Sequence, residues 1–152
     1  MSYDILVFKM LDNSNPFNII TPYQKRPVKF NDGVSELWIH EEDLKPSVWN
    51  NVNQGIHSFF DLYWCRQRSR MCNNMTYYAI IPAGVPFYVG IDFDVVSSRL
   101  LIFETADDLN RYEEKNGKAS PLRVETLSDA MIPEGKVVKE VSCKRSLRYE
   151  TT

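Results

Sequence analysis

Two neighbouring stretches, residues 76–90 and 95–104, form the most hydrophobic part of the chain. Both are rich in β-branched and aromatic residues, which favour strands. Pro82 and Gly84 interrupt the first stretch, and residues of these types end strands and make turns. The pattern therefore predicts a hairpin over residues 77–103, and we expect this hairpin to lie at the centre of the fold.

The N-terminal third has the pattern of a small sheet. Residues 3–10 are mostly apolar, which predicts a buried strand. Residues 28–30 and 34–39 flank an Asn-Asp-Gly turn, and Asp-Gly accepts the positive φ of a tight turn, so we expect a second hairpin there. A short edge strand over residues 17–20 and a short strand over residues 56–59 complete this part.

The segment after the expected strand at 56–59 has helical spacing. Its apolar positions are three, four and seven residues apart, which places them on one face of a helix over residues 60–72. These positions are Phe60, Tyr63, Trp64 and Met71. Ser58 and Asp61 resemble a capping box, so we expect the helix to begin after Ser58 and to pack through that apolar face.

A second long helix is expected after Thr105. Threonine is a preferred N-cap, and Asp107 and Asp108 would lie in the first turn, where the helix dipole favours anions. The Asn-Gly pair at residues 116–117 is a typical helix end. A shorter helix or two turns is expected within residues 41–51, because Pro46 limits a longer one.

Chain length bounds the architecture. A chain of 152 residues is most simply one domain, because one core of this size buries roughly two thirds of the surface that the unfolded chain exposes. Further strands are expected over residues 121–126 and 136–143. We predict an α+β fold: a single compact domain over residues 1–143 with a mixed or mainly antiparallel sheet and two or three helices. A terminal edge strand or loose tail follows over residues 144–152.

Charge and cysteine content narrow the function classes. The formal net charge of -2 gives no overall field that would attract nucleic acid or an anionic membrane. The chain has neither a secretory signal nor an apolar run of about 20 residues, so we expect a cytoplasmic protein without a membrane partner. Cys65, Cys72 and Cys143 lack zinc-site spacing, which predicts buried free thiols and neither metal nor cofactor; a zinc site that includes His57 is the alternative.

Several polar residues are candidates for chemistry or binding. His57, at the expected corner between strand and helix, can act as an acid, a base or a nucleotide contact, or it can be a structural histidine bonded to a carbonyl. In a helix, Arg66 and Arg70 would lie on a solvated face. In an extended chain they would line one face beside Tyr77 and Tyr78, a combination that suits single-stranded nucleic acid.

Residues 55–104 resemble a set of small, mostly uncharacterised proteins of gut bacteriophages and of mobile elements of Bacteroidetes. The resemblance rests on Gly-Ile-His-Ser-Phe at 55–59, Ile-Pro-Ala-Gly followed by Phe-Tyr within 81–88, and Val-Ser followed by Leu-Leu-Ile within 96–102. Those proteins have lysine where this chain has Ala83, and tyrosine where it has Phe87. The resemblance implies an accessory protein of a phage or mobile element.

A more distant likeness is to the split-sheet fold of ADP-ribosyltransferases. In that fold a strand, a helix, an Ile-Pro-x-Gly strand and a later acidic strand follow in the same order. The likeness implies that His57 or Ser58 would lie near a nicotinamide pocket and Glu104 near the position of the catalytic acid.

These observations lead to one expected function and two alternatives. We expect a non-enzymatic accessory protein that binds a protein partner or assembles with itself, with a nucleotide as the alternative ligand; the charge argues against nucleic acid. The first alternative is an ADP-ribosyltransferase-like domain that binds or modifies a nucleotide, and the second is a virion component. The candidate residues are His57, Ser58 and Glu104 for catalysis, and Tyr77, Tyr78, Arg66 and Arg70 for ligand binding.

Overall fold

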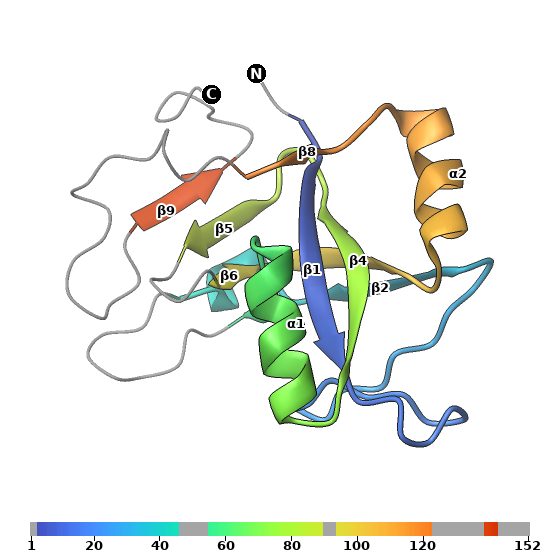
Figure 1. Cartoon of the computed structure of the whole chain (residues 1–152). Helices are drawn as coiled ribbons and strands as arrows, with labels where there is room; N and C mark the ends of the chain where they lie inside the picture. The colour runs from blue at the N-terminus through green and yellow to red at the C-terminus, as the bar shows by residue number, and fades with distance from the viewer. Residues whose placement is uncertain (1–2, 46–54, 90–93, 123–138, 143–152) are drawn as a thin grey trace.

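The computed structural model describes residues 3–45, 55–89, 94–122 and 139–142 (Figure 1). These residues form strands in one sheet, two α-helices and a short 3₁₀-helix. In chain order the elements are β1 (Ile5–Leu11), β2 (Val34–Trp38), η1 (Glu41–Asp43), β3 (Ile56–Phe59), α1 (Leu62–Met71), β4 (Met75–Ile81), β5 (Pro86–Val89), β6 (Asp94–Ser97), β7 (Arg99–Phe103), α2 (Ala106–Asn116), β8 (Ser120–Pro121) and β9 (Lys139–Ser142).

All strands belong to one sheet with the order β2-β7-β4-β1-β3-β6-β5-β9, and β8 pairs with β1 outside this path. The β1–β8 pair is parallel, and the other pairs are antiparallel. The predicted α+β class with a mainly antiparallel sheet and two helices is therefore confirmed.

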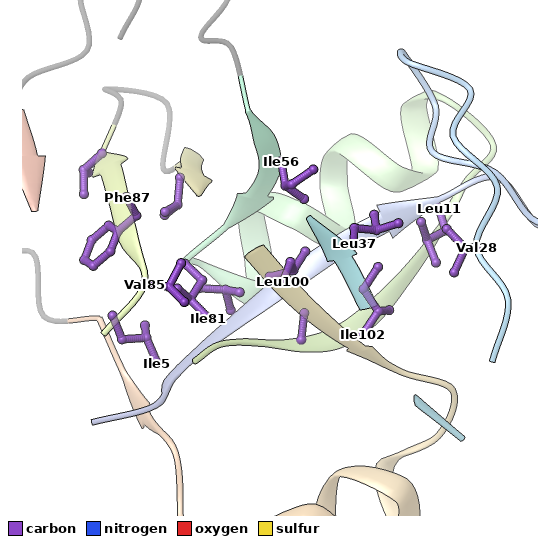
Figure 2. Packing of buried hydrophobic residues seen from close by; sticks show 14 residues of the cluster. Ile5, Leu11, Val28, Leu37, Ile56, Ile81, Val85, Phe87, Leu100 and Ile102 are labelled. Atoms are coloured by element: carbon purple, nitrogen blue, oxygen red, sulfur yellow. The ribbon is translucent and has the colours of Figure 1, made fainter. Parts of the chain in front are cut away.

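The sheet curls back on itself at Ser98. This residue alone separates β6 from β7, yet β6 pairs with β3 and β5 whereas β7 pairs with β2 and β4. The path from β7 through β4, β1 and β3 thus returns to β6, the neighbour of β7 in the chain. The curled sheet has an inner face that is filled by apolar side chains; Figure 2 shows Ile5, Leu37 and Leu100 among them.

Strand β1 separates the inner core from the outer face of the sheet. Successive side chains of a strand point to opposite faces. Ile5, Val7 and Leu11 therefore belong to the inner core, whereas Phe8 and Met10 pack outside against Cys65 of α1. In Figure 1, α1 lies in front of β1, and α2 lies beside β4. By the same alternation Lys9 lies on the inner face.

The helix α1 forms where expected, but its cap and its buried face differ from the prediction. Asp61 is the N-cap, and its carboxylate accepts hydrogen bonds from the Tyr63 and Trp64 backbone amides at 2.9 and 3.5 Å. Tyr63 and Met71 are 67% and 79% exposed. The buried residues of the helix are Cys65 and Ser69, because packing against β1 and β4 selects the small residues for the contact. The predicted capping box from Ser58 is wrong.

The helix α2 confirms its sequence signals. The Thr105 side chain accepts a hydrogen bond from the Asp108 amide at 3.2 Å, and the Asp108 carboxylate accepts one from the Thr105 amide at 3.0 Å. Gly117, with φ of 89°, ends the helix as expected. Both ends depend on residues that are close in sequence, which is why the pattern identifies them.

Of the two predicted hairpins, the central one is confirmed and the N-terminal one is wrong. The two hydrophobic stretches within residues 77–103 pair with each other as antiparallel strands, β4 with β7 and β5 with β6. β4 also pairs with β1 and lies near the middle of the sheet. β2 pairs with β7 rather than with residues 28–30. Residues 17–20 form no strand; Ile20 makes isolated bridges to Asp12 and Pro27.

The remaining expectations concern short elements and the C-terminal part. β3 confirms the strand at 56–59, and η1 is shorter than the helix expected within 41–51, whose residues 46–51 lie outside the described part. β8 and β9 fall in the regions of the expected C-terminal strands. The proposed tail over residues 144–152 also lies outside the described residues. Among the described helices, none is long and apolar enough to cross a bilayer.

Candidate functional site

A pocket with a volume of about 260 Å³ lies between β1, β2, β3 and the loop of residues 21–26. Its lining combines apolar walls with two cationic side chains. The lining residues are Lys9, Thr21, Pro22, Tyr23, Gln24, Arg26, Leu37, Ile56 and His57. Leu37 and Ile56, which form part of the apolar wall, also belong to the inner core (Figure 2).

The loop of residues 21–26 is folded on itself by its own hydrogen bonds. The Thr21 amide donates to the Arg26 carbonyl at 2.9 Å, and the Thr21 hydroxyl accepts from the Arg26 amide at 2.9 Å. The Lys25 amide donates to the Thr21 carbonyl at 3.1 Å, and Lys25 adopts a φ of 56°. These bonds give the outer wall of the pocket a defined shape.

Two hydrogen bonds to residues farther along the chain attach this loop to the sheet on both sides of the pocket. Arg26 Nη2 donates to the Trp38 carbonyl at the end of β2 at 3.0 Å. Gln24 Nε2 donates to the Gly55 carbonyl, just before β3, at 3.5 Å. The loop therefore spans from β2 to β3, and the guanidinium of Arg26 is held beside the pocket.

Lys9 supplies the buried charge of the pocket. Its side chain is only 6% exposed, and Nζ donates to the His57 carbonyl at 2.6 Å. The ladder between β1 and β3 pairs Phe8 with Phe59. Lys9 and Ser58 are the next residues along the two strands, on the opposite, inner face. The amine therefore lies close to the point where β1 and β3 meet.

The pocket has positive charge without a compensating carboxylate in the described part of the chain. Its described lining residues include no Asp or Glu. The ion pairs found among the described residues join other groups: His40 with Glu42, Arg99 with Glu36, and Arg111 with Asp108. Desolvation lowers the pKa of Lys9 to about 8; Cys65 opposes the shift and the charge of Arg26 adds to it.

This arrangement suits a small ligand with an apolar body and an anionic end. Ligand pockets are mostly apolar, with a few placed polar groups that set orientation. Lys9 and Arg26 supply such groups here, because their cations can bind a carboxylate, whereas Leu37 and Ile56 offer apolar contact. In its neutral form, Lys9 is also a nucleophile.

Two of the predicted catalytic residues lie at or next to this pocket. His57 lines it, and its backbone carbonyl receives the Lys9 bond. Ser58 is 1% exposed, and its hydroxyl has no hydrogen-bond partner among the residues that the structure describes. Ser58 shares the inner face with Lys9, as the register of β1 and β3 requires.

The other predicted catalytic residue, Glu104, lies elsewhere. It is exposed, and it lines a separate depression with Phe17, Lys29 and Phe30. Its backbone amide donates to the Gly33 carbonyl at 2.8 Å. The structure therefore does not bring Glu104 into one cavity with His57.

The predicted ligand contacts are dispersed over both faces of the sheet. Tyr77 stacks on Phe30 against the inner core, and its hydroxyl accepts from Asn13 Nδ2 at 3.1 Å. Tyr78 packs on the outer face against Phe8. The two tyrosines thus share no platform.

Arg66 and Arg70 are exposed on α1. Because this segment is helical, the extended arrangement that would align them beside the tyrosines does not form. The arrangement on which the nucleic-acid alternative depended is therefore contradicted.

Sequence reasoning missed Lys9, Arg26 and the loop between them. A signal for Lys9 was present, because Ile5, Val7, Lys9 and Leu11 alternate and the lysine stands where the strand places apolar residues inside. No comparable signal exists for Arg26, which reaches the pocket only because residues 12–28 fold back over the sheet end.

The cysteines fit the thiol prediction in part. Cys65 is buried and free, and burial raises the pKa of its thiol, which keeps it in the protonated form. Cys72 is exposed at the C-cap of α1, so the prediction of a buried thiol is wrong there. Cys143 lies outside the described residues. Among described side chains, no group of three potential metal ligands comes together.

Comparisons of the chain with protein-family models, with curated proteins and with solved structures found no match.

Proposed function

We propose that this protein is a small, non-enzymatic binding module of the phage or mobile-element accessory type, and that it binds a small molecule with an apolar body and a carboxylate. The observation that carries the proposal is the buried Lys9 ammonium, which faces a pocket without a described carboxylate. The likeness of residues 55–104 to small phage proteins supports the accessory role.

Burial of the Lys9 charge costs free energy. A pKa lowered from 10.5 to about 8 corresponds to roughly 3 kcal/mol of disfavoured ammonium, by the conversion of about 1.4 kcal/mol per pH unit. A methionine could fill the same position in β1 without that cost. A bound carboxylate would offset part of it, because an opposite charge favours the ammonium form.

The size of the pocket limits the ligand. A volume of about 260 Å³ is slightly below the range of roughly 300–1,000 Å³ that is usual for drug-sized ligands. A short branched carboxylic acid fits a pocket of this volume better than a dinucleotide, which would extend beyond the pocket. Since His57 and Glu104 line separate depressions, the ADP-ribosyltransferase-like alternative gains no support from a shared cavity.

The test compares isocaproate with isocaproamide, which has the same apolar body and no charge. We expect isocaproate at about 100 times its dissociation constant to add about 2.7 kcal/mol to the stability. This raises the melting temperature by several degrees in a domain of this size. Binding measured by calorimetry should weaken as the pH rises above about 8, because Lys9 then loses its proton in the free protein.

The Lys9→Met variant should lose the preference for the acid over the amide, whereas Lys29→Met, at an exposed lysine outside this pocket, should keep it. Equal binding of acid and amide to the wild-type protein would contradict the proposal. A rise of the melting temperature with ADP-ribose or NAD, and none with isocaproate, would favour the nucleotide alternative instead.

A further inference from the structure

We propose that Lys9 also captures α-keto acids with a short apolar side chain, by forming a reversible imine between its Nζ and the ligand's keto carbon. This inference rests on the proposed function, because the same pocket must first bind the acid. It goes beyond that function by assigning a covalent step to a named atom and by naming the ligand class.

The placement of the two cationic residues supports this ligand class. An α-keto acid carries a carboxylate and a carbonyl on adjacent carbon atoms. Arg26, held by the Trp38 carbonyl on one side of the pocket, suits the carboxylate because a planar guanidinium can bind both of its oxygens. Lys9, on the inner face of β1, then faces the neighbouring keto carbon, and Leu37 and Ile56 offer contact to the apolar side chain.

The surroundings of Lys9 favour the reactive form of its amine. Desolvation brings its pKa to about 8, so roughly a quarter of the molecules carry the neutral amine at about pH 7.5, compared with about 0.1% for an exposed lysine. The 2.6 Å bond to the His57 carbonyl holds Nζ in place without supplying a negative charge. A desolvated lysine beside another cation is a typical amine nucleophile for carbonyl compounds.

The covalent step is balanced by the two reactants alone. The lone pair of neutral Lys9 Nζ attacks the keto carbon, a C–N bond forms, and the carbonyl oxygen takes up a proton. The carbinolamine then loses this oxygen as water, which leaves a C=N bond. The net reaction joins amine and ketone to give imine and water, and water entry reverses it.

Ser58 offers a further polar group on the same face. Its hydroxyl is buried and has no partner within the described part of the chain. A buried hydroxyl without a partner is costly. Ser58 lies beside Lys9 in the register of β1 and β3, next to the pocket rather than in its lining.

The experiment incubates the purified full chain with α-ketoisocaproate and sodium cyanoborohydride at about pH 7.5, where neutral Lys9 is well populated by its pKa of about 8. Cyanoborohydride delivers hydride to the imine carbon and converts it to a stable secondary amine, which peptide mass spectrometry locates. We expect Lys9 to be labelled at least ten times faster than Lys29, and the labelling rate to rise with a midpoint near pH 8. Isocaproate, which has no keto group, should compete.

The Lys9→Arg variant keeps the charge and cannot form the imine, so it should lose this label. Lys29→Arg is the matched control and should label Lys9 as the wild type does, with the α-amino group of the chain as an internal standard in every sample. Isocaproate binding without a Lys9 label would overturn the imine and leave the proposed binding function intact. No binding of either acid would overturn both.

Discussion

Two charged side chains of this protein are almost equally buried, yet their surroundings differ. Lys9 is 6% exposed and Asp108 is 7% exposed. The Asp108 carboxylate accepts from the Thr105 amide at 3.0 Å and from the Thr105 hydroxyl at 2.7 Å, and it pairs with Arg111. Lys9 has a bond to one neutral carbonyl, and no described carboxylate pairs with it.

Asp108 carries a structural charge, whereas Lys9 carries a candidate functional one. A buried charge is tolerated when hydrogen bonds and an opposite charge replace the water that it loses. Asp108 meets this condition and holds the start of α2. Lys9 does not meet it within the described residues, and strongly perturbed groups beside a pocket are typical of functional sites.

The largest effect is expected from Gly33→Ala. A Cβ at Gly33 would overlap the Asp108 carboxylate, and the residue has a φ of 81°, which alanine disfavours. Overpacking and a left-handed backbone together should lower the free energy of unfolding by about 4 kcal/mol, measured by urea denaturation.

Gly117→Ala is the matched control for Gly33→Ala. Gly117 has a similar φ of 89°, but a Cβ there would meet open space, so the cost should be only about 1 kcal/mol. Equal costs at the two positions would show that the space beside Asp108 is not closed.

Lys9→Met should remove about 3 kcal/mol from the change in the free energy of unfolding between about pH 8 and about pH 10.5. The pKa of Lys9 is about 8 in the folded protein and about 10.5 in the unfolded chain, so between these values the unfolded chain binds more protons. In the wild type, this residue therefore raises the free energy of unfolding as the pH rises from about 8 to about 10.5. The variant should lack that rise.

Urea denaturation at pH values below 8 and above 10 measures this difference. Lys29→Met, at an exposed position, should follow the wild-type curve. A constant difference between wild type and Lys9→Met across the range would mean that the charge of Lys9 is compensated in the folded protein.

Asp108→Ala should lower the free energy of unfolding by about 2 kcal/mol, because it removes the acceptor of two hydrogen bonds and half of the capping box. Asp107→Ala, in the same helical turn but exposed, should cost less than about 0.5 kcal/mol. Similar losses for both variants would reduce the role of Asp108 to its charge near the helix dipole.

The smallest effect is expected from Tyr112→Phe, at about 1 kcal/mol. The Tyr112 hydroxyl donates to Asp4 Oδ2 at 3.0 Å, and the ring keeps its contact with Phe103 after the substitution. Burial, followed by the charge of Asp4, raises the pKa of Tyr112 to about 12.

The unfolded chain loses the phenolic proton at a lower pH than the folded protein, so the wild type loses stability from about pH 10 to about pH 12. Tyr112→Phe should reduce that loss in alkaline melting curves. An unchanged alkaline slope would contradict the hydrogen bond to Asp4.

Part of the fold follows from local patterns. The strands at 3–10 and 56–59, the α1 and α2 segments, and the α+β class were predicted correctly. The start of α2 is the clearest case, because Thr105 and Asp108 are three residues apart and satisfy each other. Such contacts need no information from elsewhere in the chain.

Outside the central hairpin, the strand partners could not be predicted in this way, and neither could the pocket. β2 has an Asp-Gly turn beside it but pairs with β7, more than 60 residues later, because the inner core selects that register. The pocket joins Lys9, Arg26 and His57 from three separate segments. Only His57 among them was a candidate, since a lysine and an arginine are ordinary residues until their neighbours are known.

The sequence by itself determined the class of fold, the positions of several strands and both helices, and the ends of α2. These features depend on periodicity and on contacts over three or four residues. The tertiary structure decided the pairing of the other strands outside the hairpin of residues 77–103, the buried face of α1 and the burial of Lys9 beside Arg26. The physical reason is that desolvation and charge depend on which distant segments meet, and this is set only when the sheet curls around its core.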